Sequence, residues 1–255
     1  MNIQQIRNAT LLLEYGGSRF LIDPMLAEQA RYPGLAGTVN SHLPYPTVPL
    51  PVPLSALLAV DAVILTHTHP DHWDEVAQAS IPKALPVYVQ HEADKRLLRQ
   101  QGFSNIRLLR GAVFQGVALH QTSGQHGDDA ALGAIGDILG EVCGVVFQHP
   151  AEPTLYLAGD TIWHPDVANS LSQHRPKVVI LNCGDAQVSG LGRIIMDQND
   201  VWQVHQAAPE AILIGSHMEA VNHAMLSRSA LRAFALEKGF SDQLLIPADG
   251  EVCAL

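Results

Sequence analysis

The chain has 255 residues, 47% of them hydrophobic, which is enough to form one large domain with a buried core. Its formal net charge of −10 argues against a nucleic-acid partner, because phosphate groups require a basic surface. No N-terminal segment combines a basic start with a long apolar run, and no apolar run has the length of a membrane span. The three cysteines, Cys143, Cys183 and Cys253, form no Cys-x-x-Cys pair, which is typical of a reducing compartment. These features predict a soluble, cytoplasmic protein that binds neither nucleic acid nor membrane.

The start of the chain has the composition of short strands. Residues 2–6, 9–15 and 19–22 are rich in β-forming side chains, and Gly16-Gly17 predicts a hairpin turn between the last two. Residues 23–53 contain many prolines and predict a long irregular loop, which in a compact domain is typically a functional lid or a disordered segment. Its apolar residues could cover a pocket or form the interface of a homo-oligomer, and the sequence leaves both alternatives open.

The remainder of the chain alternates between apolar runs and helical patterns. Strands are predicted at 62–65, 87–90, 106–109, 117–121, 142–148, 154–157, 178–182 and 211–214. Helices are predicted at 74–79, 92–101, 165–173, 200–207 and 227–238, and the glycine-rich stretch 123–140 is predicted to be a loop. Because strands in both halves are followed by helices, we expect two sheets packed together with helices outside. The expected fold is a single α/β domain, a four-layer α/β/β/α sandwich whose halves meet near Ala130.

The most informative motif directly follows the predicted strand 62–65 and reads Thr66-His67-Thr68-His69-Pro70-Asp71-His72-Trp73. Side chains two positions apart in an extended segment share a face, so His67 and His69 can bind one ion. Pro70 turns the chain, and Asp71 and His72 then point in a different direction. Four ligand-type residues at this spacing favour a metal site over a histidine-rich surface loop, and two differently aimed pairs suit two neighbouring ions.

Three further residues of ligand type, His126, Asp160 and His217, each follow a predicted strand. Any one of them alone is equally typical of loop and capping chemistry. Their recurrence at three strand ends, alongside the first motif, favours metal binding. Gly159 permits a close backbone approach before Asp160, and Thr161 can bond its carboxylate.

In this order, the His67-Thr68-His69-Pro70-Asp71-His72 motif, His126, Asp160 and His217 resemble the ligand set of the metallo-β-lactamase superfamily of metal-dependent hydrolases. The resemblance covers essentially the whole chain and implies the fold of that superfamily. It implies that one ion is held by His67, His69 and His126. It implies that a second ion is held by Asp71, His72 and His217, and that Asp160 bridges the two. Trp73 and the segment 217–223 also resemble the branch that contains ascorbate-6-phosphate lactonase.

These donors predict a dinuclear hydrolase that acts on a small-molecule substrate. Imidazole and carboxylate ligands without thiolate favour two Zn²⁺ ions, with Mn²⁺ or Fe²⁺ as alternatives. Two ions about 3.5–4 Å apart would share a water and lower its pKa towards about 7, which gives a metal-bridging hydroxide. Asp71 is expected to orient this hydroxide and to carry a proton towards the leaving group.

The predicted substrate is a lactone or another ester of a small polar or phosphorylated metabolite. A small-molecule phosphodiesterase is the nearest alternative, because the same hydroxide attacks phosphorus equally well. A non-catalytic metal-binding protein is a further alternative, although the complete ligand set argues against it.

Several residues outside the ligand set are candidates for supporting roles. His223 is predicted to contact the substrate as a second catalytic residue. Asp23 ends a strand and is predicted to bond the outer ring nitrogen of a ligand histidine. Asp61 and Asp185 are typical of turns, and Trp73 is expected to pack beneath the ligand loop. The proline-rich loop offers four more candidates for substrate contact: Arg31, Tyr32, His42 and Tyr45.

Overall fold

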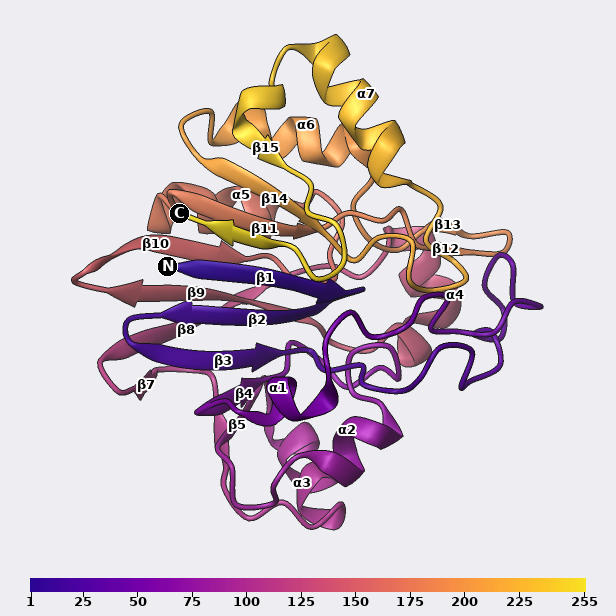
Figure 1. Ribbon diagram of the computed structural model, residues 1–255. Helices are drawn as coiled ribbons and strands as arrows, with labels where there is room; N and C mark the ends of the chain where they lie inside the picture. Colours follow the sequence, from indigo (N-terminus) through magenta and orange to yellow (C-terminus); the bar gives the residue numbers. More distant parts are fainter.

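Two seven-stranded mixed sheets face each other in the computed structural model, which describes residues 1–255, and helices cover their outer faces (Figure 1). The first sheet contains, in order, β16 (Val252–Ala254), β1 (Asn2–Arg7), β2 (Thr10–Tyr15), β3 (Ser18–Ile22), β4 (Ala62–Ile64), β5 (Val87–Val89) and β6 (Ile106–Leu108). The second contains β15 (Leu244–Leu245), β14 (Ile212–Ser216), β11 (Val178–Asn182), β10 (Glu152–Leu157), β9 (Cys143–His149), β8 (Val117–Ser123) and β7 (Ala112–Phe114). The predicted four-layer sandwich is therefore confirmed.

The helices lie mostly outside the sheets. Those nearest the first sheet are α1 (Leu54–Leu58), α2 (Glu75–Ser80) and α3 (Glu92–Gln100). Those on the second sheet are α5 (Pro165–His174), α6 (Gln198–Ala207) and α7 (Arg228–Lys238). Beyond one end of the sandwich lie α4 (Asp129–Leu139) and the small hairpin of β12 (Gln187–Val188) and β13 (Gly192–Arg193) (Figure 1). A 3-10 turn, η1 (Ser241–Gln243), precedes β15, and none of the helices has the length and apolarity needed to cross a bilayer.

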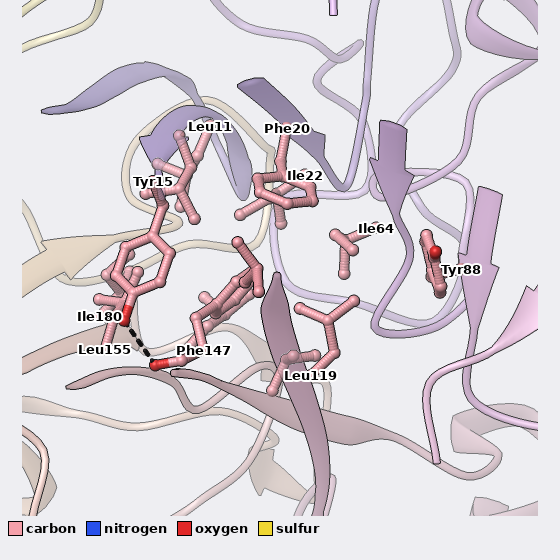
Figure 2. Packing of buried hydrophobic residues seen from close by; sticks show 14 of the residues in the cluster. Leu11, Tyr15, Phe20, Ile22, Ile64, Tyr88, Leu119, Phe147, Leu155 and Ile180 are labelled. Atoms are coloured by element: carbon pink, nitrogen blue, oxygen red, sulfur yellow. Dashed lines mark hydrogen bonds between the residues drawn. The ribbon is translucent and has the colours of Figure 1, made fainter. Parts of the chain in front are cut away.

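The inner faces of the two sheets form the main core (Figure 2). Because side chains alternate along a strand, Leu11 and Tyr15 point between the sheets while Leu12 packs under the helices. Phe147 meets Tyr15 edge-on from the opposite sheet, with ring centroids 5.9 Å apart. The buried Tyr15 hydroxyl lies 2.9 Å from the carbonyl oxygens of both Phe147 and Pro153, so its donor is satisfied inside the core.

Strand direction brings several strand ends to one edge of the sandwich. In the second sheet β10, β11 and β14 are parallel, and β8 runs the same way because β9 is antiparallel to both β8 and β10. In the first sheet β3, β4 and β5 are parallel to one another. The loops that follow β4, β8, β10 and β14 gather on the side where α4 and the β12–β13 hairpin lie (Figure 1).

The proline-rich stretch 23–53 forms a long loop, as expected, and hydrogen bonds from Arg7 hold its two ends together. Arg7 is fully buried and donates to the carbonyl oxygens of Met25 and Val48, both at 2.9 Å, and to that of Ala27. The loop contains no regular helix or strand, and its one internal β-bridge joins Tyr32 to Tyr45.

Two expectations about the middle of the chain are wrong. The stretch 123–140 is not a loop throughout, because α4 occupies most of it, with the Asp128 carboxylate accepting from Ala131 N at 2.8 Å as its N-cap. Nor do the halves meet near Ala130: the chain passes to the second sheet between β6 and β7, and β16 returns to pair with β1. The short elements α1, β7, β12, β13, β15 and β16 were not predicted.

Candidate metal centre

All seven predicted ligand residues meet at the shared edge of the sandwich. Their donor atoms form three overlapping groups, and within each group the atoms lie within 4.8 Å of one another. The groups are His67 with His69 and His126, His67 with His72 and Asp160, and Asp71 with His72 and His217. Every member is buried except His69, which is half-buried.

The loop after β4 adopts the geometry that its spacing predicts. His67 and His69 lie on one side, with Nε2 of the first 3.0 Å from Nδ1 of the second. A turn follows Pro70, because the main-chain N–H groups of His72 and Trp73 both donate to the His69 carbonyl oxygen at 2.9 Å. Trp73 is buried against the helices outside the first sheet, as expected.

Asp23 organises two of the histidines at once. Its carboxylate accepts from Thr66 N at 2.8 Å and Thr66 Oγ1 at 2.7 Å, and faces His72 Nδ1 at 3.0 Å. Since the Thr66 hydroxyl donates to Asp23, it accepts from His67 Nδ1, 3.2 Å away. Both rings therefore carry a proton on Nδ1 and direct Nε2 into the cluster. This arrangement matches the supporting role predicted for Asp23.

Two more rings are oriented by main-chain acceptors. His126 Nδ1 lies 2.9 Å from the Ile194 carbonyl oxygen, and His69 Nε2 lies 3.0 Å from that of Ile138. Since a carbonyl oxygen only accepts, these outer nitrogens hold the protons and the inner nitrogens present lone pairs. Lone pairs that converge with the Asp160 carboxylate repel one another unless a cation lies between them. The donor set therefore fits divalent metal ions.

The charges around the cluster attract a cation. Although burial opposes it, Asp160, Asp71 and Asp23 hold the pKa of His72 well above its usual value. Burial likewise opposes ionisation of Asp160, yet His72 and His217 hold the pKa of that carboxyl well below its usual range. The carboxylates on both sides of His72 thus favour a positive charge at its inner nitrogen, which either a proton or a bound cation would supply.

Two of the other histidines are in the form that binds a metal. Burial lowers the pKa of His67 well below its usual value and lowers that of His126 to about 4. Neutral imidazole is the metal-binding form, so these rings need lose no proton at neutral pH.

An apolar chamber of about 230 Å³ opens onto the cluster. Its apolar lining comes from the 23–53 loop, from α4 and from the residues around the β12–β13 hairpin, and includes Leu35, Ile135, Ile138, Leu139, Val188 and Ile194. Asp71 and Asp160 line its floor, and neither a lysine nor an arginine side chain reaches it. The chamber suits an uncharged substrate with an apolar group.

His223 lies in this chamber together with Asp71, although no helix connects it to His217. It is 4% exposed, and burial lowers its pKa to about 4, so the ring is neutral. Its Nδ1 has no hydrogen-bond partner. The structure therefore places this residue, which was predicted to be catalytic, in the chamber wall beside the predicted ligand Asp71.

The 23–53 loop lines the chamber, but not with the four residues that the sequence suggested for substrate contact. Arg31 and His42 are exposed, and Tyr32 packs on the buried Tyr45 with ring centroids 5.3 Å apart. None of these four lines the chamber, which is bounded instead by residues 35–38. The sequence did not predict a role for residues 35–38 because Leu-Ala-Gly-Thr contains no side chain typical of a catalytic or metal site.

The two acidic residues regarded as turn residues have local roles. The Asp185 carboxylate accepts from Gln187 Nε2 at 2.7 Å, and the exposed Asp61 carboxylate accepts from Arg19 N at 2.8 Å. Neither lines the chamber or joins the ligand groups.

Comparison with known proteins gives several close matches. Residues 18–218 match the model of a β-lactamase superfamily domain. The UPF0173 protein YddR of Bacillus subtilis (strain 168) is 46% identical over 253 residues, which cover 98% of each chain. A UPF0173 metal-dependent hydrolase of Xanthobacter autotrophicus is 26% identical over 198 residues, 74% of each chain.

Two solved structures are similar over nearly their full length. The isothiocyanate hydrolase from Delia radicum gut bacteria is 49% identical, with a TM-score of 0.97 over 100% of this chain and 99% of that one. A possible metal-dependent hydrolase from Veillonella parvula is 41% identical, with a TM-score of 0.98 over the same shares of the two chains.

Proposed function

The chain belongs to the metallo-β-lactamase superfamily, within it to the UPF0173 family of metal-dependent hydrolases, and on this premise we propose that it hydrolyses isothiocyanates with an apolar substituent. The reaction is R–N=C=S + H₂O → R–NH₂ + COS. Water oxygen bonds to the central carbon, the carbon–nitrogen bond breaks, and both water protons end on nitrogen.

The observation that carries this proposal is the apolar chamber above the metal centre. An isothiocyanate is uncharged, so it needs no cationic side chain, and its substituent would pack against Leu35 and Ile138. The relative named isothiocyanate hydrolase supports the same substrate class, because it is 49% identical and covers the whole chain.

Two ions fit the donors best. His67, His69 and His126 would hold one ion, and Asp71, His72 and His217 the other. Asp160 lies between the sets, with Oδ2 3.1 Å from His72 Nε2 and 4.0 Å from His67 Nε2, so it would serve both. The oxygen and nitrogen donors favour Zn²⁺, with Mn²⁺ and Fe²⁺ as alternatives. When bound, the ions would lower the pKa of a shared water towards about 7 and polarise the group under attack.

The chain's own residues would then direct the protons. Burial opposes ionisation of Asp71, but His72 and His217 hold its pKa well below the usual range, so it stays an acceptor. Its main-chain oxygen accepts from Asn8 Nδ2 at 3.0 Å, which fixes the turn that carries it. Asp71 would take a proton from the attacking water and return it to the substrate nitrogen. The neutral His223 ring would donate a hydrogen bond to the negative charge that develops there.

A lactone or another ester is the second candidate, since Trp73 and the segment 217–223 resemble the ascorbate-6-phosphate lactonase branch. The same attack would open a lactone carbonyl. The chamber offers no lysine or arginine to bind a phosphate away from the metal centre, so an unphosphorylated lactone fits better than a sugar phosphate lactone. Kinship with named hydrolases argues against a non-catalytic metal-binding protein.

A substrate panel tests the proposal. Protein loaded with Zn²⁺ or Mn²⁺ is incubated with methyl, allyl and 2-phenylethyl isothiocyanate, with an apolar lactone, and with bis-p-nitrophenyl phosphate. We expect turnover of the isothiocyanates, with amine and carbonyl sulfide released in equal amounts. Metal-loaded protein that leaves all three isothiocyanates intact would refute the proposal, and lactone opening in that sample would support the second candidate.

A further inference from the structure

The segment between β14 and α7 fastens the 23–53 loop to the metal centre. Thr47 bonds to it twice, with N donating to the Ala220 carbonyl oxygen at 2.8 Å and Oγ1 to that of Glu219 at 2.6 Å. A further attachment is the side chain of Asn222, which is 4% exposed. The segment thus begins at the predicted ligand His217 and holds the 23–53 loop through Asn222, the residue before His223.

Every polar atom of the Asn222 amide is engaged with the loop. Oδ1 accepts from Leu35 N at 3.1 Å, while Nδ2 donates to Thr38 Oγ1 at 2.8 Å and to the Val39 carbonyl oxygen at 2.9 Å. The orientation of the amide is fixed by chemistry, because Leu35 N–H can only donate and the Val39 oxygen can only accept. No side chain without both a donor and an acceptor reproduces this clamp.

The clamped residues are the ones that bound the chamber. Residues 35–38 line it, and Val39 N and Ser189 N tie the same segment to the β12–β13 hairpin through the carbonyl oxygens of Gln187 and Gly37. Gln187 N in turn donates to the His223 carbonyl oxygen at 3.0 Å. Asn222 therefore connects the chamber wall to the turn that presents His223.

We propose that Asn222 is a positioning residue that fixes residues 35–39 as the wall selecting the apolar group of the substrate. The selectivity part of this inference rests on the proposed function. Asn222 touches neither the reacting atoms nor the predicted ligands: it acts through Leu35 and Thr38, and loss of the clamp would loosen the wall without removing a ligand.

The test combines hydrogen exchange with kinetics on the metal-loaded full chain. In Asn222→Ala we expect exchange of the Leu35 amide to accelerate about tenfold or more, since it loses its only acceptor. We expect KM for 2-phenylethyl isothiocyanate to rise about tenfold, kcat for methyl isothiocyanate to stay within about twofold, and metal content to be unchanged. The matched control is Thr47→Val, which removes a loop attachment outside the chamber and should leave the ratio of kcat/KM values between the two substrates unchanged.

Each result decides a definite point. If exchange of the Leu35 amide is unchanged, Asn222 does not hold residues 35–39 in place. If exchange is faster but the preference between the two substrates is unchanged, residues 35–39 do not select the apolar group. If Asn222→Ala does not fold, Asn222→Leu replaces it, because leucine also lacks the acceptor for Leu35 N and the donors to Thr38 Oγ1 and Val39 O but fills more of the space, and the same changes are expected. A wild type inactive on every isothiocyanate would refute the proposed function and the selectivity part with it, whereas the exchange comparison would still decide the clamp.

Discussion

Replacing Asp23 with asparagine should weaken metal binding without disturbing the fold. Asp23 has a φ of 44°, in the left-handed region that asparagine also tolerates, so the backbone can be kept. The substitution exchanges one carboxylate oxygen for an NH₂ group and removes one negative charge. It is therefore a local change in hydrogen-bond chemistry.

The consequence follows from the three bonds that Asp23 accepts. If the asparagine oxygen keeps the bond from Thr66 N, its NH₂ group faces His72 Nδ1, 3.0 Å away in the wild type. His72 must then accept on Nδ1 and carry its proton on Nε2, which points into the metal centre. The opposite amide orientation sets NH₂ against the Thr66 N–H. We expect metal affinity to fall about 10–100-fold, or about 1.4–2.8 kcal/mol, as for other residues that orient a ligand.

The assay is competition with a chromogenic chelator, together with the metal content of the purified protein. Asp61→Asn serves as the control, because its exposed carboxylate also accepts a main-chain N–H, from Arg19, but lies outside the centre. A variant that folds like the wild type and binds both ions with wild-type affinity would refute the tautomer argument.

Four further changes have expected outcomes. Asp71→Asn should retain the circular dichroism spectrum but lower kcat about 10²–10⁴-fold; unchanged turnover and metal content would contradict its proton-carrying role. Removing the metal with a chelator should lower the melting temperature by about 5–11 °C for each ion whose free concentration had been about 100 times its Kd. Such an ion stabilises the folded state by about 2.7 kcal/mol, and each kcal/mol shifts the melting temperature by about 2–4 °C. Calorimetry that shows no shift would contradict metal binding to the folded state. Ile138→Lys, at a side chain 72% exposed on the chamber rim, should raise KM for apolar substrates about tenfold with little change in melting temperature; an unchanged KM would exclude Ile138 from the substrate wall. Tyr15→Phe should cost about 1–2 kcal/mol in urea unfolding and leave kcat/KM unchanged, because its hydroxyl serves only the core, and a loss of activity at full stability would count against this separation.

The ligand cluster could be predicted because its signals are local. His67, His69 and His72 lie within six positions, and parallel strands carry the later predicted ligands, such as Asp160 and His217, to the same edge. Short apolar runs likewise predicted most strands, and the succession of strands and helices in both halves predicted the sandwich. These features depend on short stretches of chain and on a general rule of sheet geometry.

The substrate chamber could not be predicted in the same way. Its wall consists of ordinary apolar residues, such as Leu35 and Ile138, whose grouping depends on contacts far apart in the sequence. Helix α4 was not predicted because Gly133 and Gly136 depress helix propensity. The helix is also kinked, with a non-helical φ of −137° at Ile135. Pairing of β16 with β1 joins opposite ends of the chain and leaves no local trace.

The bond from His69 Nε2 to the Ile138 carbonyl oxygen joins a catalytic-site ring to the last turn of α4, where helix carbonyls have no partner of their own. Because Ile138 lines the chamber, a bulky occupant that pushed α4 outward would also tilt the imidazole. With a metal ion held by His69, the size of the occupant would then change the ligand field. In a cobalt-substituted sample, longer substituents should shift the visible absorption bands further, so that the colour of the protein reports the molecule it holds.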